Sequence, residues 1–266
     1  MMITLNPFSE LAKTVAPIFM QSFVILMITL VIIGTLVDII HKKNVKYFFE
    51  NAKKAKKSAK KTLSSREKTS VVIKTVAQDI LTTSELGAGK RRAAHLLGMY
   101  GTIFFWSASV IMIFCFSSSS ADTPIVWPIL WHLGAIMTCV GGLWFWLFLR
   151  VDVYAEAHPW YRIIKADLFV LALLASSAFG LIWSFLQSLN LNRWDDTFFL
   201  ILFIISNLTL FGGVYWSKFA HMFYKPGAAL QKNLAEADGS RDNLPPPADA
   251  PEKFGLGIKR EQPKHY

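Results

Sequence analysis

The chain has 266 residues, of which 53% are hydrophobic and 17% are charged, and its net charge is +10. Its apolar residues come in runs of about twenty or more, the length that crosses about 30 Å of hydrocarbon, and the mean hydropathy is +0.38. This composition excludes an ordinary soluble domain. The two cysteines, both within apolar runs, exclude a disulfide framework and a zinc or iron–sulfur site built from this chain alone.

A backbone exposed to lipid must satisfy its own hydrogen bonds, so the apolar runs predict helices. The fold class expected is an all-α integral membrane protein, a bundle of five transmembrane helices. In chain order, the spans cover about residues 15–40, 93–116, 127–149, 167–189 and 198–219. The amino-terminal residues lack the pattern of a cleaved signal peptide, and none is expected.

The cationic residues concentrate in one segment. Between His41 and Arg92 there are fifteen Lys or Arg and four Asp or Glu, a local net charge of +11, which leaves the rest of the chain at −1. Cytoplasmic loops carry such an excess of Lys and Arg. The pattern therefore predicts an N-out, C-in topology in a cell inner membrane, and it favours membrane lipid over nucleic acid as the reason for the charge.

Four regions follow from this organisation: residues 1–40, an outer amino terminus with the first span; 41–92, a basic cytoplasmic loop; 93–226, the bundle of the other four spans; and 227–266, a cytoplasmic tail. Residues 72–81 have apolar positions at helical spacing, which predicts an amphipathic helix on the membrane surface. The tail is polar and rich in proline, so we expect it to be flexible until it meets a partner.

Two histidines indicate a cofactor. His95 lies about one turn inside the second span, and His221 lies at the inner end of the predicted fifth span. Alternating topology places both near the cytoplasmic face, as a bis-histidine haem b requires. Gly98 and Gly101 would let a porphyrin approach the backbone. The alternative is that both are ordinary histidines at helix ends.

Other polar residues belong to the same hypothesis. Arg91, Arg92, Arg162 and Lys218 are candidates for pairing with haem propionates. His41 and Asp38, three residues apart at the inner end of the first span, and His132 in the third span are candidates for quinone or proton contacts. Each also has a simpler interpretation, a snorkelled helix end for the first pair and interfacial packing for His132. Asp167 most simply caps the fourth span.

The sequence resembles the cytochrome b subunits of the respiratory nitrate reductase gamma type and the membrane subunits of heterodisulfide reductase. The resemblance is carried by RRAAH at the start of the second span, SKFAH at the end of the predicted fifth, the third-span stretch WPILWHLGAIMTCVGG and the stretch KADLFVLALL. It covers roughly residues 15–226. A small membrane anchor associated with dissimilatory adenylylsulfate reductase is similar too.

In that family, two haems b are ligated by two histidine pairs, and His95 and His221 match the inner pair. The positions that match the outer pair are Phe105 and Phe203. An aromatic ring of this kind does not ligate iron, so the resemblance implies at most one haem b, on the cytoplasmic side. The lysine-rich insert is not part of the family pattern.

The function expected is that of a membrane anchor and electron-transfer subunit, not a stand-alone enzyme. It would link soluble cytoplasmic iron–sulfur or flavin subunits of an oxidoreductase to the quinone pool. The alternative is a haemless anchor that recruits a soluble oxidoreductase of sulfur metabolism. A transporter or channel is disfavoured because the spans contain almost no ionisable residues away from their ends.

Overall fold

The protein is described by a computed structural model that covers residues 2–86, 89–118, 123–154, 158–189, 193–215, 217 and 221–240. Most of these residues are helical, the others lie in turns, bends and irregular segments, and no strand occurs among them. The chain divides into two compact units. We call Met1–Val37 with Ala93–Ala220 the bundle unit, and Asp38–Arg92 with His221–Tyr266 the lysine-rich unit. Each is described below by itself.

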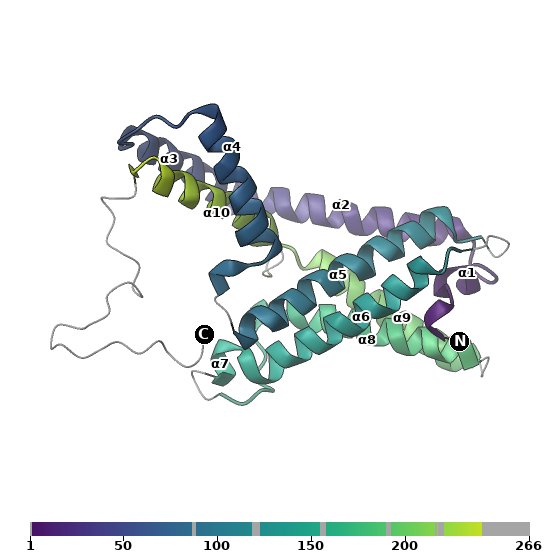
Figure 1. The fold of residues 1–266 in the computed structure, drawn as a ribbon. Helices are drawn as coiled ribbons and strands as arrows, with labels where there is room; N and C mark the ends of the chain where they lie inside the picture. Colours follow the sequence, from purple (N-terminus) through teal and green to yellow (C-terminus); the bar gives the residue numbers. More distant parts are fainter. Residues whose placement is uncertain are drawn as a thin grey trace. The chain divides into compact units, whose positions relative to one another are not determined.

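The bundle unit is built from long apolar helices with short helical pieces between them (Figure 1). Its long helices are α2 (Pro17–Lys42), α5 (Lys90–Cys115), α6 (Val126–Trp144), α8 (Leu168–Leu189) and α9 (Arg193–Gly212). Helix α2 belongs to this unit as far as Val37, and α5 belongs to it from Ala93 onward. Its short pieces are η1 (Met2–Thr4), α1 (Pro7–Leu11), the π-helical η4 (Phe145–Leu149), α7 (Val151–Tyr154) and η5 (Lys165–Asp167).

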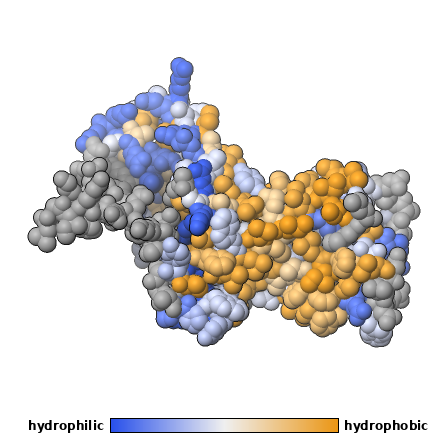
Figure 2. All heavy atoms as spheres, turned by 60° about the horizontal axis from the view of Figure 1, so that its bottom comes forward, coloured by the Kyte–Doolittle hydropathy of each residue, from blue (hydrophilic) through white to orange (hydrophobic). Residues whose placement is uncertain are grey.

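In the described part of the chain, five helices are long and apolar enough to cross a membrane: Pro17–Lys42, Lys90–Cys115, Val126–Leu149, Lys165–Leu189 and Trp194–Gly212. Large hydrophobic side chains remain exposed on these helices, such as Phe19 at 68% and Phe148 at 61%. Hydrophobic residues cover much of the visible face of the bundle (Figure 2). An exposed apolar surface of this extent requires lipid as solvent, and the prediction of a multi-pass membrane protein is confirmed.

The fifth span differs from its predicted position. Helix α9 begins at Arg193 and ends at Gly212, so it does not continue to residue 219. Asp195 and Asp196 were placed in a loop, but they lie in the first turn of α9, where carboxylates are favoured by the helix dipole. The end has a physical reason, because Gly212 and Gly213 have low helix propensity.

Glycines bring the backbones of α5 and α6 into contact. A Cβ added to Gly134 would lie 2.5 Å from the Phe105 nitrogen, and one added to Gly101 would lie 2.6 Å from the Thr138 nitrogen. At the other end of the pair, a Cβ on Gly141 would lie 2.6 Å from the Ala94 carbonyl oxygen. Small residues permit this close approach in membrane helices. Since Ala94 faces α6, the adjacent His95 points elsewhere, and it is exposed.

Aromatic rings fill the interior of the bundle. Phe105 of α5, Trp131 of α6, Trp183 of α8 and Phe203 of α9 are each at most 8% exposed. Trp183 stacks on Phe203 with ring centroids 5.9 Å apart and an interplanar angle of 18°. Phe8 of α1 packs edge-on against both tryptophans, at 5.9 and 5.7 Å. One continuous aromatic core therefore joins four spans to the amino-terminal segment.

The lysine-rich unit is a helical unit rather than an unstructured loop. It contains α3 (Asn44–Lys57), α4 (Ser65–Lys74), the π-helical η2 (Thr75–Leu81), η3 (Ser84–Leu86) and α10 (His221–Ala237). Helix α10 contacts α3, α4 and η2. Asn233 of α10 donates to the Thr75 hydroxyl at 2.8 Å and to the Asp79 carboxylate at 2.7 Å. The Asp238 carbonyl oxygen also accepts hydrogen bonds from the backbone amides of Lys60 and Lys61, which extends the same packing.

Two expectations for this unit are corrected. The insert after the first span was expected to be a polar loop up to the helix predicted over residues 72–81, but residues 44–57 and 65–71 are helical as well. The tail was expected to be flexible from residue 227, but α10 continues to Ala237. Asn233 gives the reason, because its contacts with η2 hold α10 against the unit. The residues 241–266 lie outside the described part of the chain.

Candidate functional site

His95 lies on α5 near the start of its apolar run, with an exposed side chain. Gly98 lies one turn later on the same helix face, and a Cβ added there would meet no atom within 4 Å. The backbone next to His95 is therefore approachable by a flat ligand. Gly101 differs, because its α-carbon faces α6 and is occupied by the helix contact.

His221 has a different structural position from the one predicted. It is the first residue of α10, nine residues after Gly212 ends α9, so it does not close the fifth span. Its side chain lies outside the described part of the structure. His95 belongs to the bundle unit and His221 to the lysine-rich unit, and their meeting around one iron stays a prediction.

Of the four propionate candidates, Arg91 and Arg92 belong to the lysine-rich unit and Arg162 to the bundle unit. Arg92 donates through its Nε to the Thr82 carbonyl at 2.7 Å. The preceding residue, Arg91, is half-buried. The Arg162 side chain is exposed, while its carbonyl accepts a hydrogen bond from Arg150 at 2.8 Å. Lys218 lies outside the described residues. Arg91 and Arg92 open α5 within two turns of His95.

Asp38 is a buried carboxylate of the lysine-rich unit, at 1% exposure. It forms an ion pair with Lys42 one turn later on α2 and accepts a hydrogen bond from the Tyr224 hydroxyl of α10 at 3.2 Å. Burial, the hydrogen bond to Asp38 and the negative charge of Asp38 raise the pKa of Tyr224. Asp38 therefore ties the end of α2 to α10, whereas its predicted neighbour His41 is exposed.

His132 is fully buried and bridges two spans. Its Nδ1 lies 2.7 Å from the Pro128 carbonyl oxygen, and its Nε2 lies 2.8 Å from the Ser184 hydroxyl of α8. A neutral imidazole fits these partners by donating to the carbonyl and accepting from the hydroxyl. Both ring nitrogens therefore have partners within α6 and α8, and a quinone or proton role for His132 stays a prediction.

A buried ion pair was missed by the sequence reasoning. Arg150, 4% exposed, donates through Nη1 to the Asp167 carboxylate at 2.7 Å, and its guanidinium lies 4.0 Å from the Trp146 ring centroid. Asp167 also accepts from the Ile164 amide at 3.0 Å, as a helix cap does. Through these contacts Arg150 holds the turn before α8. The sequence feature that could have indicated this pair is an arginine placed just after an apolar run.

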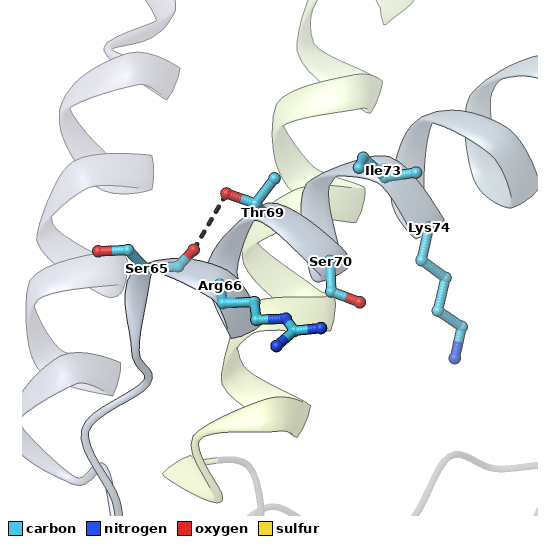
Figure 3. Close-up of a pocket in the computed structure, with 6 residues that line it drawn as sticks. All are labelled: Ser65, Arg66, Thr69, Ser70, Ile73 and Lys74. Carbon is cyan, nitrogen blue, oxygen red and sulfur yellow. Dashed lines mark hydrogen bonds between the residues drawn. The ribbon is translucent and has the colours of Figure 1, made fainter.

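A groove lies along α4 of the lysine-rich unit, with a volume of about 580 Å³ (Figure 3). It is open to solvent and its lining comes from one helix face. That lining is Ser65, Arg66, Thr69, Ser70, Ile73 and Lys74. Sequence reasoning predicted a surface helix over residues 72–81 but not this face, which starts seven residues earlier.

Comparison of the chain with family models, with curated proteins and with solved structures gave no match.

Proposed function

We propose that the protein is the membrane anchor and electron-transfer subunit of a quinone-linked cytoplasmic oxidoreductase, with one haem b between His95 and His221. The chain would lie N-out and C-in in a cell inner membrane. The observation that carries the proposal is the pairing of five apolar spans with a separately folded cationic unit. Such a chain has a part that resides in lipid and a part that presents charge to a soluble partner.

The surroundings of His95 fit a porphyrin. Its imidazole is exposed, and the open space at Gly98 removes the side chain that would block a flat macrocycle one turn away. Haem b would supply one-electron redox chemistry at this place, while the chain supplies ligation and charge. Arg91 and Arg92, together with Arg162 and Lys218, are the cations proposed to pair with its propionates.

The interior of the bundle supports the limit of one haem. Phe105 and Phe203 stand where the resembling family has its outer ligands, and both are buried against Trp131 and Trp183. Packed protein interiors have few voids larger than a water molecule, and a second porphyrin would have to displace these rings. Electrons would therefore be exchanged on the cytoplasmic side, where His41 and Asp38 are the quinone and proton candidates, while His132 would be such a candidate near the outer face.

The alternative function is a haemless anchor that recruits a soluble oxidoreductase. The position of His221 favours it, because this residue begins α10 of the lysine-rich unit instead of completing a span. In this alternative His95 is an interfacial histidine, and the protein contributes only binding.

The double variant His95→Ala with His221→Ala separates the two functions. A tagged chain is isolated from native membranes, and both the co-purifying soluble subunits and the quinone-linked turnover are measured. The electron-transfer proposal predicts that the partner is retained and the turnover is lost. Unchanged turnover with the partner retained would establish the haemless anchor.

A further inference from the structure

The groove on α4 combines hydroxyl, cationic and apolar side chains on a single helix face. Ser70 lies between Arg66 and Lys74 at helical spacing, and Ile73 lies next to them, 63% exposed. In the part of the chain that the structure describes, the side chains of Arg66, Ser70 and Lys74 have no hydrogen-bond or ion-pair partner. Figure 3 shows Arg66 and Lys74 extending away from the helix axis.

We propose that this groove binds the phosphate headgroups of anionic phospholipids, with Ile73 entering the boundary between headgroups and acyl chains. Arginine and lysine form charge-assisted hydrogen bonds with phosphate oxygens, and a hydroxyl adds a further donor. An apolar side chain beside cations fits an interfacial helix, whose apolar face sits about 5–10 Å into the headgroup region. An aqueous phosphate would leave Ile73 in water.

The charges of the unit favour an anionic occupant. Glu67 is engaged by Ser64 and by Lys61, and Asp79 accepts from Asn233 and Ser84. The carboxylates of α4 and η2 are therefore used inside the unit. The groove cations keep their charge uncompensated, which complements an anionic surface.

Tethering to spans favours lipid over a soluble acidic protein. Residues 82–89 join the end of η2 at Leu81 to α5, which is a span. A chain extends at most about 3.6 Å per residue, so this connection reaches roughly 30 Å. A short tether gives the groove an effective concentration in the millimolar range at the membrane surface. The apolar series also continues along η2 with Val76 and Leu81, which are 41% and 48% exposed.

The experiment uses the full chain in lipid nanodiscs, with Cys115→Ala and Cys139→Ala to remove the native thiols and Ile73→Cys to carry an environment-sensitive fluorophore. Emission and quenching by neutral acrylamide are compared in phosphatidylcholine discs and in discs that contain phosphatidylglycerol. We expect a blue-shifted, shielded label only in the anionic discs. Salt that shortens the Debye length to about 3 Å should reverse the shielding.

Charge reversal tests the groove itself. The change Arg66→Glu with Lys74→Glu removes two surface cations, and each cation is worth about a fivefold change in binding. The ratio of membrane-bound to free label should therefore fall at least about thirtyfold. The matched control is Lys53→Glu with Lys54→Glu on α3, which makes the same change of charge outside the groove and should leave the label shielded. The salt titration of the unreversed chain stays informative if a reversed variant fails to fold.

Three outcomes would overturn the proposal. The first is a label that is equally exposed in both kinds of disc. The second is an equal loss of shielding in the groove and control variants, which would assign the effect to the field of the whole unit. The third is shielding by soluble polyglutamate in phosphatidylcholine discs, which would make the groove a site for acidic polypeptides. The proposal does not rest on haem, since a haemless anchor would bind lipid in the same way.

Discussion

The rings of Phe105 and Phe203 pack edge to face in the buried core of the bundle, with their centroids 6.3 Å apart. They come from α5 and α9, and Phe105 also packs on Trp131 while Phe203 stacks on Trp183. These rings therefore belong to the aromatic core that packs the spans together.

Truncating this core should destabilise the bundle. Phe105→Ala removes a ring that is 1% exposed, and Phe→Ala changes in cores typically lower the free energy of unfolding by about 3–5 kcal/mol. The matched control, Phe114→Ala on the same helix, removes a ring that is 43% exposed to the lipid side. Unfolding in mixed detergent is the measurement. Equal losses for the two variants would show that Phe105 has no special role.

The glycine contact between α5 and α6 should tolerate no added methyl group. Gly134→Ala places a Cβ 2.5 Å from the Phe105 nitrogen, and the helices must separate. Overpacking of this kind costs about 1–3 kcal/mol. Gly212→Ala meets no atom within 4 Å and serves as the control. Thermal unfolding in detergent should show a lower midpoint for Gly134→Ala alone, and a similar midpoint for both variants would refute the contact.

The buried pair of Arg150 and Asp167 should be sensitive to removal of one partner. Asp167→Asn leaves a guanidinium that is 5% exposed without its counterion, and breaking such a pair costs about 3–5 kcal/mol. Replacing both residues, as Arg150→Met with Asp167→Leu, should cost less, since it removes the unpaired charge. Free energies of unfolding from a double-mutant cycle give the comparison. Additive losses would mean that the two charges do not interact.

Helix α4 should lose stability in acid. The backbone amide and hydroxyl of Ser64 donate to the Glu67 carboxylate at 2.8 and 2.9 Å and lower the pKa of Glu67. A carboxyl with a lowered folded pKa stabilises the fold above its unfolded pKa, and this stability is lost as pH falls through the folded value. Hydrogen exchange of the α4 amides, corrected for the intrinsic rate, should show faster opening in acid. Glu67→Gln should remove that dependence, and an unchanged dependence would contradict it.

The spans were predictable because lipid solvent demands long apolar runs, and the first span was placed within about two residues of Pro17–Lys42. The end of the fifth span was not predictable, because residues 213–219 remain rich in apolar and aromatic side chains. Hydropathy therefore does not mark the end of the helix at Gly212. The helix ends there because Gly212 and Gly213 have low helix propensity. This is a weaker sequence signal than the hydropathy of the neighbouring residues.

The lysine-rich unit was less predictable for a different reason. Helices α3 and α10 depend on partners distant in sequence, such as Asn233 with Thr75 and Asp79. Residues 44–57 and 227–237 are mostly lysine, alanine and polar residues, and their few apolar side chains form only short groups such as Tyr47, Phe48 and Phe49. Of the candidate site, the ligation of one haem by His95 and His221 stays a prediction, and Gly101 is occupied by the contact with α6. The pair of Arg150 and Asp167 escaped the sequence reasoning because no pattern in the sequence joins the two residues.

The central claim is that His95 and His221 ligate one haem b, and its most direct test is the haem content and reduced visible spectrum of the purified chain from cells able to make haem. We predict one haem b per chain, with an α-band after dithionite reduction that is lost in His95→Ala and in His221→Ala but retained in His158→Ala. A wild-type chain without the α-band, or an α-band that persists in both single variants, would contradict the account.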